Sequence, residues 1–254
     1  MDTVGGMMNF AQALGLARSL LIYYAVPWRP WQMRRLYGRF IHPGDLCFDV
    51  GAHAGNRLRV WRQLGARVVG LEPQPLFLGT LMRLYGRSPQ ITLLDQAVGA
   101  APGEATLHIS QRTPTVSTLS ASWMRAVQRD ASFAGVAWET AVPVRVTTLD
   151  ELIGEYGRPA FCKIDVEGFE LDVLRGLSQP IPALSFEVIP AALAVALGCV
   201  DRLEALGRYR YSYAPGETHR LSGDWLSAEA MRHFLQQQSP QDGSGDIYAV
   251  QSRG

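Results

Sequence analysis

The sequence predicts an α/β protein whose core is a doubly wound, mostly parallel sheet with helices on both faces. Two observations support this fold class. From Gly44 onward, short apolar segments alternate with segments in which apolar residues recur at helical spacing, the pattern of parallel strands joined by helices. In addition, the first apolar segment runs into a glycine turn, Asp45–Gly55, and then into a helix that begins at Asn56. This arrangement is typical of the ligand-binding edge of such sheets.

Seven segments are predicted to form strands and six to form helices of a domain at residues 43–254, because Pro43 and Gly44 separate it from the chain before it. The predicted strands are Leu46–Val50, Val68–Leu71, Ile91–Leu94, Ala160–Ile164, Leu184–Val188, Tyr209–Tyr213 and Ile247–Val250. The predicted helices are Asn56–Leu64, Gln74–Tyr85, Leu149–Tyr156, Glu170–Leu177, Ala191–Leu206 and Ala228–Gln237.

The composition is that of one larger soluble globular domain. The chain has 254 residues, of which 47% are hydrophobic and 19% charged, so it can bury a substantial core. A net charge of +1 implies no strong field for nucleic acid or a membrane, and no nucleic-acid partner is expected. Cys47, Cys162 and Cys199 stand in apolar contexts and indicate buried thiols of a reducing compartment, so we expect a cytoplasmic protein.

Residues 1–42 are predicted to form a helical extension ahead of this domain. Apolar residues follow a helical period over Phe10–Val26, and Trp31–Phe40 suits a second short helix with solvated arginines. The longest apolar run, Leu20–Pro27, is too short to cross a bilayer, so no transmembrane segment is expected. We expect the first helix to pack on the sheet domain or to cover its pocket. Peripheral contact with a membrane, and exchange between subunits of a homo-oligomer, are the alternatives.

The alternation of strands and helices is interrupted after the third predicted strand. Ala105–Ser110 and Val142–Thr147 alternate like exposed strands, and Gln111–Thr140 between them is long and polar. Long connections of that kind usually serve binding. We therefore expect Ser117 and Thr118, in the middle of this connection, to contact a ligand.

The turn after the first strand has the spacing Asp49-x-Gly51-x-x-x-Gly55. A dinucleotide fingerprint needs Gly-x-Gly-x-x-Gly so that the backbone can approach a pyrophosphate, and here His53 stands where close approach favours glycine. The spacing instead favours a nucleoside attached to a small zwitterion, of which S-adenosylmethionine (SAM) is the common example. Backbone N–H groups of the turn and of Asn56 would face that ligand. A turn that only joins strand to helix is the alternative.

Acidic residues follow the next two strands at the same predicted edge. Glu72-Pro73 ends the second strand, about 20 residues after the glycine turn, where a carboxylate can accept from both hydroxyls of a ribose. Asp95-Gln96 ends the third strand, where the carboxylate or the backbone after it could accept from an adenine amino group. An acid that caps the next turn is the alternative. Because the carboxyl ends of parallel strands meet, we expect Asp49, Glu72 and Asp95 to converge.

The densest group of charged residues is Phe161–Glu170. Strand periodicity places Lys163, Asp165 and, if the strand extends that far, Glu167 on one face, and Glu187 on the next strand adds another acid. Grouped ionisable residues are costly unless they serve a site or pair with one another, so a salt-bridge network at the sheet edge is the alternative. Lys163 is also the only lysine among 24 basic residues, which favours a role that arginine could not fill.

With these segments in view, the chain resembles the FkbM family of SAM-dependent methyltransferases from about Phe40 to Val188, with a looser similarity at Gly245–Tyr248. The motifs that carry the resemblance are Pro43-Gly44-Asp45, Phe48-Asp49-Val50-Gly51-Ala52-His53-Ala54-Gly55-Asn56, Leu64-Gly65-Ala66, Glu72-Pro73, Thr147-Thr148-Leu149-Asp150 and Lys163-Ile164-Asp165-Val166-Glu167-Gly168.

The resemblance implies a Rossmann-like, seven-stranded class I methyltransferase fold with SAM as methyl donor. It further implies O-methylation of a small-molecule acceptor at a hydroxyl, on a sugar or a glycosylated metabolite. The residues before Phe40 and the connection Gln111–Thr140 match nothing specific, and we expect them to select the acceptor.

Methylation of an aliphatic hydroxyl needs a group that takes its proton. The candidates are Asp165, Glu167, Glu187, His53 and a neutral Lys163. We favour a carboxylate of the Asp165–Glu167 pair, with Lys163 orienting it or the acceptor, and the predicted catalytic set is Asp165, Glu167, Lys163 and Glu187. The predicted cofactor contacts are Asp49, Gly51, His53, Gly55, Asn56, Glu72, Pro73, Asp95, Gln96, Ser117 and Asp165.

Three alternatives concern the chemistry itself. The carboxylates of Asp165, Glu167 and Glu187 are suitable oxygen ligands for Mg²⁺, although no residue is assigned as a metal ligand. A nucleotide-dependent oxidoreductase on the same fold is disfavoured by the glycine spacing. A non-catalytic protein that binds SAM or a partner is disfavoured by the complete set of acids, because a scaffold does not need them.

Overall fold

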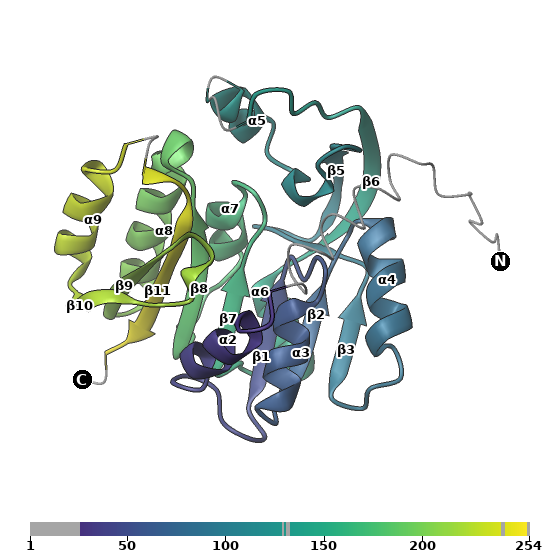
Figure 1. Ribbon diagram of the computed structural model, residues 1–254, viewed down its shortest axis with the longest axis horizontal. Coiled ribbons are helices and arrows are strands. Elements are labelled where there is room, and N and C mark those ends of the chain that lie inside the picture. The colour runs from purple at the N-terminus through teal and green to yellow at the C-terminus, as the bar shows by residue number, and fades with distance from the viewer. Residues whose placement is uncertain (1–25, 129, 131–132, 240–241, 253–254) are drawn as a thin grey trace.

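The computed structural model describes residues 26–128, 130, 133–239 and 242–252. These residues form a main sheet of eight strands in the order β10-β9-β11-β8-β7-β1-β2-β3 (Figure 1). The strands are β1 Leu46–Val50, β2 Arg67–Leu71, β3 Ile91–Leu94, β7 Phe161–Ile164, β8 Ala183–Val188, β9 Tyr209–Pro215, β10 Ser222–Leu226 and β11 Gly245–Gln251. All seven predicted strands are confirmed, and β10 is an eighth strand at the edge.

The sheet is mostly parallel, as predicted. Strand β1 pairs in parallel with β2 and β7, and β3 and β8 extend the parallel sheet on either side. Strand β11 runs antiparallel between β8 and β9. The carboxyl ends of β1, β2, β7 and β8 therefore lie at one edge, together with the amino end of β11. This register brings the start of β11, at Asp246, beside Glu187 at the end of β8.

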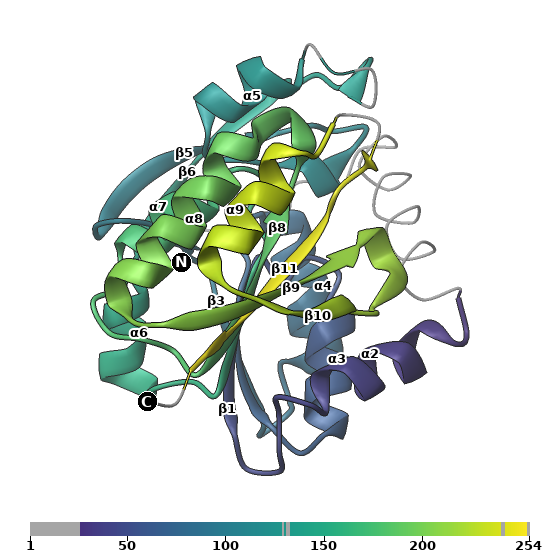
Figure 2. The same ribbon diagram turned by 90° about the vertical axis from the view of Figure 1, so that its left-hand side faces the viewer.

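Helices cover both faces of the sheet (Figure 2). The helices are α2 Arg29–Tyr37, α3 Asn56–Gln63, α4 Pro75–Tyr85, α6 Leu149–Tyr156, α7 Glu170–Arg175, α8 Leu193–Leu206 and α9 Ala228–Gln236. Side chains of α6, α7, α8 and α9 share one apolar core with the sheet, and those of α2, α3 and α4 share the core on the opposite face. The six predicted domain helices are thus confirmed, with ends that differ by no more than two residues.

The short helix predicted at Trp31–Phe40 is α2, which begins two residues earlier than expected. Its Tyr37 ring packs edge-on against Trp61 of α3 and Phe161 of β7, with ring centroids 5.3 and 5.6 Å apart. This aromatic contact holds α2 on the sheet. The helix predicted over Phe10–Val26 lies outside the described residues apart from Val26. None of the helices in the described ranges is long and apolar enough to cross a membrane.

A second, three-stranded sheet lies above the carboxyl edge of the main sheet (Figure 1). It consists of β4 Ala97–Val98, β6 Thr140–Thr147 and β5 Gly103–Ile109, in that order. The two predicted exposed strands are confirmed, and they pair with each other in antiparallel register.

The connection between β5 and β6, predicted as a plain polar loop, contains the short helix α5, Ala121–Val127. The Ser120 hydroxyl caps this helix by accepting from the Trp123 N–H, and Trp123 and Val127 are buried. The buried tryptophan and the side-chain cap stabilise a helix that the polar composition of this stretch does not indicate.

Candidate functional site

A cavity opens where the carboxyl ends of β1, β2 and β7 meet the second sheet. The empty space between its walls amounts to about 780 Å³, including the solvent at its mouth. Nine residues predicted for the site line it, namely Gly51, His53, Asn56, Glu72, Pro73, Gln96, Ser117, Asp165 and Glu167. Predicted cofactor and catalytic residues therefore share one cavity.

Glu72, at the end of β2, fixes the glycine turn from the cofactor end of the cavity. Its Oε2 accepts from the backbone N–H of His53 at 2.8 Å, and its Oε1 accepts from that of Gln74 at 2.9 Å. Burial raises the pKa of Glu72 to about 7, although both backbone donors favour the charged form. Each carboxylate oxygen has a second lone pair, so Glu72 can accept from a ligand while it holds the turn.

The glycine turn itself is shaped by contact with β7. Gly51 has φ +83°, and a Cβ atom there would stand 1.9 Å from the carbonyl oxygen of Asp165. Only glycine permits this close approach of two backbones. His53, two residues on, packs its ring against Phe77 with centroids 3.8 Å apart. Burial and the nearby charge of Arg57 lower the pKa of His53 to about 3, so the ring is neutral and is a poor proton acceptor.

A chain of five charged groups runs along and beneath the cavity, whose wall Arg57 and Asp165 line. Arg57 Nε donates to Asp49 Oδ1 at 2.8 Å, and its Nη1 lies 3.0 Å from Asp165 Oδ2. Lys163 Nζ lies 3.6 Å from the same oxygen of Asp165 and 2.6 Å from Asp246 Oδ1. Two acids of the predicted set are therefore held by two cations, and Lys163, buried beneath the surface, contacts carboxylates on both sides.

Arg57 and Asp246 were not predicted. In the sequence, Arg57 is one of many arginines on a helix, and Asp246 lies far from the other acids. One feature of the sequence could have identified Arg57. It follows Asn56 in the first turn of the predicted helix, and this turn faces the end of β1. Nothing local marks Asp246, since only the antiparallel register of β11 brings it to this edge.

The charge chain decides the ionisation of its members. Burial alone would raise the pKa of Asp165, but the charges of Lys163 and Arg57 hold it below its usual range. Burial opposes the charged form of Lys163, but the carboxylates of Asp165 and Asp246 outweigh that effect and raise its pKa. Lys163 is therefore a cation, and the neutral lysine considered as a base is wrong. The predicted alternative of a salt-bridge network is thus present, and two of its members, Arg57 and Asp165, line the cavity.

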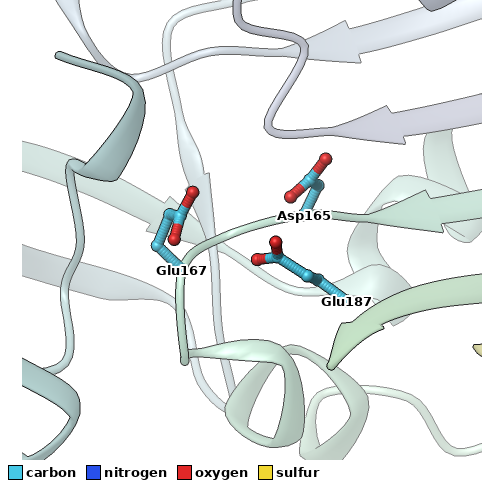
Figure 3. Close-up of side chains that lie close together, drawn as sticks. All are labelled: Asp165, Glu167 and Glu187. Atoms are coloured by element: carbon cyan, nitrogen blue, oxygen red, sulfur yellow. The ribbon is translucent and has the colours of Figure 1, made fainter. Parts of the chain in front are cut away.

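Asp165 is also one of three carboxylates that gather at the end of β7 and β8, together with Glu167 and Glu187 (Figure 3). One oxygen from each of Asp165, Glu167 and Glu187 lies within 4.8 Å of the others. Burial raises the pKa of Glu167, and the neighbouring charges of Asp165 and Glu170 add to this shift. Burial and the charges of Glu167 and Asp165 likewise raise the pKa of Glu187. Among the described residues Glu187 Oε2 has no hydrogen-bond partner. The cluster therefore contains one ionised acid, Asp165, and two carboxyl groups whose environment favours the neutral, protonated form.

The turn that carries Glu167 is fixed from two sides. Glu167 has φ +52° and Gly168 has φ +85°, so the strand ends at Ile164 and does not extend to Glu167. Glu170 Oε1 accepts from the N–H groups of Val166 and Gly168 at 3.1 and 3.2 Å. From the opposite side, the Thr118 hydroxyl donates to the carbonyl oxygen of Glu167 at 2.6 Å. The connection between β5 and β6 thereby covers the turn.

The remaining predicted residues lie off the cavity wall. Asp49 and Lys163 are buried beneath it in the charge chain, and Gly55 begins α3 with its carbonyl oxygen accepting from Tyr85. Asp95 is exposed at the end of β3 and does not line the cavity, whereas its neighbour Gln96 does. Glu187 stands behind Glu167 and lines a smaller space of about 200 Å³ beside Trp123.

Ser117 links the connection between β5 and β6 to the segment that follows β2. Its hydroxyl lies 3.2 Å from Gln74 Oε1, and Gln74 is buried two residues after Glu72. Gln74 also lines the cavity and was not predicted, because a glutamine before a helix that begins with proline resembles an ordinary capping residue. The cavity therefore has polar, hydrogen-bonding side chains at Glu72 and Gln74, and at Glu167 it has a carboxyl group that accepts a proton when it is ionised. Such a site can hold a nucleoside at one end and deprotonate a bound hydroxyl at the other.

The fold and the site together define a Rossmann-like protein with a cavity and a cluster of acidic residues at the carboxyl edge of its sheet. The chain matches the Methyltransferase FkbM domain family over residues 49–192, which is more than half of its length and contains every cavity acid named above. The chain therefore belongs to the FkbM methyltransferase family. The family assignment favours methyl transfer over the hydride transfer considered as an alternative.

The individual proteins that the chain resembles share little sequence identity with it. A hexuronic acid methyltransferase, AglP, from Haloferax volcanii is 24% identical over 148 residues, which cover 57% of this chain and 55% of that protein. The match thus spans about half the length of this curated relative. A precorrin-6y C5,15-methyltransferase from Geobacter metallireducens aligns at 14% identity over 88% of each chain, with a TM-score of 0.43. An O-methyltransferase from Bacillus cereus, solved in complex with SAH, aligns at 11% identity over 95% of this chain and 89% of that one, also with a TM-score of 0.43.

Proposed function

We propose that the protein transfers the methyl group of SAM to a hydroxyl oxygen of a small, sugar-like acceptor. The observation that carries this proposal is that Glu72 and Glu167 line the same cavity. Glu72 has the position and the free lone pairs to bind a ribose, and Glu167 is the proton acceptor nearest to the opposite end. The relative from Haloferax volcanii, named as a hexuronic acid methyltransferase, supports a sugar as acceptor.

The residues at the cavity fit SAM on their own chemistry. Glu72 would hold the ribose, and the backbone of the Gly51–Gly55 turn together with Asn56 would face the polar end of the ligand. Gln96 and the backbone after it stand where the adenine would lie, in the place first considered for Asp95. When bound, SAM supplies the methyl group and a good leaving group, and the protein supplies position and a base.

Glu167 is proposed as the base that takes the acceptor proton. Asp165 is tied to Arg57 and Lys163, which hold its pKa low, so it is a weak acceptor. Glu167 forms no ion pair with another residue in the described part of the chain, and burial raises its pKa. A base is most effective when its pKa lies near the working pH. In this proposal Asp165 positions the acceptor hydroxyl, and Arg57 and Lys163 hold Asp165 in place.

The proposal is tested by Glu167→Gln, which keeps the shape of the side chain and removes its basicity. We expect kcat for methyl transfer to a panel of glycosides to fall by about 10²- to 10⁴-fold, while SAM affinity, measured by calorimetry, changes no more than a few-fold. Glu167→Asp should restore part of the activity. Exposed Glu104 on β5 provides the control, and Glu104→Gln should behave as wild type.

Two results would contradict this proposal separately. Full activity of Glu167→Gln would remove Glu167 as the base but leave the enzyme a methyltransferase. Absence of SAM binding by the wild-type protein would remove the methyl donor itself. In the intact enzyme, kcat/KM should rise with pH as the Glu167 carboxyl ionises, because only the carboxylate accepts a proton.

The acidic cluster also raises the question of Mg²⁺. Asp165, Glu167 and Glu187 offer three carboxylates, and Mg²⁺ takes oxygen ligands in octahedral geometry. Arg57 and Lys163, however, already supply positive charge beside Asp165. We therefore expect methyl transfer to continue after dialysis against EDTA. Loss of activity that Mg²⁺ alone restores would instead make the cluster a metal site, and Glu187→Gln would then weaken Mg²⁺ binding.

A further inference from the structure

A second cavity lies between α2 and the segment that follows β9, away from the lining of the first. Its empty space amounts to about 820 Å³, including the solvent at its mouth. Side chains of α2 form one wall and residues 219–221 form the other. The lining is Trp31, Gln32, Arg35, Leu36, Arg39, His219, Arg220 and Leu221. No residue of the site described above belongs to it.

The charge of this cavity is entirely positive. Three guanidinium groups, those of Arg35, Arg39 and Arg220, line it, and no aspartate or glutamate does. None of the three forms an ion pair with another residue that the structure describes. The segment 26–44 contains four arginines and no acid. Most surface charges are solvated individually, but these three converge from two elements that lie some 180 residues apart in the sequence.

The cavity also has an apolar floor and an aromatic wall. Leu36 is buried in the core beneath it, and Leu221 packs against the same core. Trp31 is 60% exposed, and the Arg35 guanidinium lies 5.8 Å from the centre of its ring. A hydrated anion alone would not need the apolar floor or the indole. The combination fits a molecule in which an anionic group is attached to an organic body.

We propose that this cavity, which we call the arginine pocket, binds a phosphate-bearing organic molecule. Arginine forks match phosphate oxygens in bidentate geometry, and arginine is favoured where phosphate is recognised. Arg39 and Arg220 bind the phosphate from opposite walls, and Gln32 donates a further hydrogen bond. Trp31, held by Arg35, covers the organic body. The shared chemistry is a phosphate monoester or diester, from a soluble metabolite or from a lipid headgroup.

The segment that lines the arginine pocket leaves the sheet at the edge that carries the first cavity, because Pro215 at the end of β9 pairs with Gly245, which also pairs with Val188 at the end of β8. His219 lines the pocket, and its Nε2 lies 3.5 Å from Glu217 Oε2. Burial and the positive charges of Arg29 and Arg57 lower the pKa of His219 to about 4, so the ring is neutral and does not add to the charge. Arg57 belongs to the charge chain beneath the first cavity. The phosphate would therefore be bound at the same edge of the sheet, but by residues that do not bind SAM.

The test uses the full-length protein and two soluble probes, inorganic pyrophosphate and glucose 1-phosphate. Each probe is titrated by calorimetry, and quenching of tryptophan fluorescence reports its approach to Trp31. The double variant Arg39→Gln/Arg220→Gln should weaken both probes at least tenfold. The matched control is Arg34→Gln/Arg59→Gln, which removes two exposed arginines that do not line the pocket, and its affinities should equal those of wild type.

A third arm separates the two sources of phosphate. Vesicles that contain phosphatidylglycerol are compared with vesicles of phosphatidylcholine in a flotation assay. Retention on the first alone, lost in Arg39→Gln/Arg220→Gln but not in the control, assigns the pocket to a lipid headgroup. Binding of glucose 1-phosphate with the same arginine dependence assigns it to a soluble ligand.

The proposal is overturned if wild type binds none of the probes, or if the double variant and the control lose affinity equally. The latter result would mean that general surface charge attracts the phosphate. Circular dichroism and SAM affinity of both variants check that the fold is intact. Since these readouts do not depend on methyl transfer, failure of the arginine pocket and failure of the proposed methyltransferase function remain distinguishable.

Discussion

At the scale of single residues, the carboxylate of Glu72 has one observed role and one proposed role. It holds the backbone of His53 and Gln74, and we propose that it also binds the ribose of SAM. In Glu72→Gln, the amide NH₂ would face one of these backbone donors, and the charge that strengthens ribose hydrogen bonds would be lost. Hydrogen bonds to charged groups contribute about 1.5–3 kcal/mol. We expect SAM affinity to fall by about 10- to 100-fold.

Calorimetric titration with SAM measures this loss. Asp95→Asn is the control, because Asp95 is exposed and does not line the cavity, and it should leave SAM affinity unchanged. If Glu72→Gln binds SAM within twofold of wild type, Glu72 is only a structural residue of the turn. If Asp95→Asn weakens binding instead, the adenine contact first considered for Asp95 is restored.

Arg57 joins the cofactor turn to the catalytic strand. It donates to Asp49 and to the carbonyl oxygen of Gly51, and it pairs with Asp165. Removing one partner of a buried ion pair costs about 3–5 kcal/mol, because the other charges stay buried without a counterion. We therefore expect Arg57→Gln to lower the free energy of unfolding by that amount, as measured by urea denaturation.

Arg59, two residues later on the exposed face of α3, is the control. Arg59→Gln should change stability by less than about 0.5 kcal/mol. Adding Asp49→Asn to Arg57→Gln should recover part of the loss, because the buried charge left unpaired by the first change is removed. A double variant that is less stable than Arg57→Gln would show that Asp49 has another stabilising partner.

At the scale of elements, α5 closes over the turn at Asp165–Gly168. A Cβ atom on Gly168 would stand 2.1 Å from the Trp123 ring, and its φ of +85° disfavours any other residue. In Gly168→Ala, we expect α5 to move away from the turn and Glu167 to lose its fixed position. Methyl transfer should then fall at least tenfold, and backbone amides of residues 117–127 should exchange faster with deuterated solvent.

Gly154 in the middle of α6 provides a matched control. A Cβ atom there meets nothing within 4 Å, so Gly154→Ala should stabilise the protein by about 0.4–1 kcal/mol through the lower entropy of the unfolded chain. Hydrogen exchange at 117–127 should be unaffected by it. Unchanged exchange in Gly168→Ala would mean that α5 does not depend on contact with Gly168.

At the scale of the whole molecule, the buried acids make stability depend on pH. Burial raises the pKa of Glu170 to about 7, well above its value in the unfolded chain. Between about pH 4.5 and 7 the folded protein therefore binds more protons than the unfolded chain, and stability from this group falls as pH rises. Glu170→Gln keeps the accepting Oε1 but cannot ionise, so it avoids this loss.

We expect Glu170→Gln to become progressively more stable than wild type as pH rises from 4.5 to 7, by up to about 3 kcal/mol. Urea denaturation at several pH values measures the difference. Glu104→Gln, at an exposed site on β5, should give a curve parallel to that of wild type. The opposite result would be a difference in free energy of unfolding between Glu170→Gln and wild type that decreases as pH rises. It would show that Glu170 is ionised in the folded protein.

Much of the fold could be predicted because its elements are marked locally. The strands β1, β2, β3, β7 and β8 are apolar runs that glycine, proline or acidic residues terminate. In contrast, β10 contains Gly223 and Asp224 and has no alternation. It becomes a strand only because it pairs with the edge of β9. The helix α5 was not predicted for a similar reason. Trp123 is buried against Gly168, which lies far away in the sequence.

The sequence by itself determined which acids stand at the ends of the parallel strands. Strand periodicity can be recognised locally, and the carboxyl ends of neighbouring parallel strands meet at one edge of the sheet. It placed Glu72, Asp165 and Glu167 correctly on one cavity. The tertiary structure alone decided their partners and hence their ionisation. Arg57, Asp246 and Thr118 reach these acids from other elements, and the pKa of a buried carboxyl depends on the charges around it in space. For this reason the identity of the base, Glu167 rather than Asp165, could be proposed only from the folded chain.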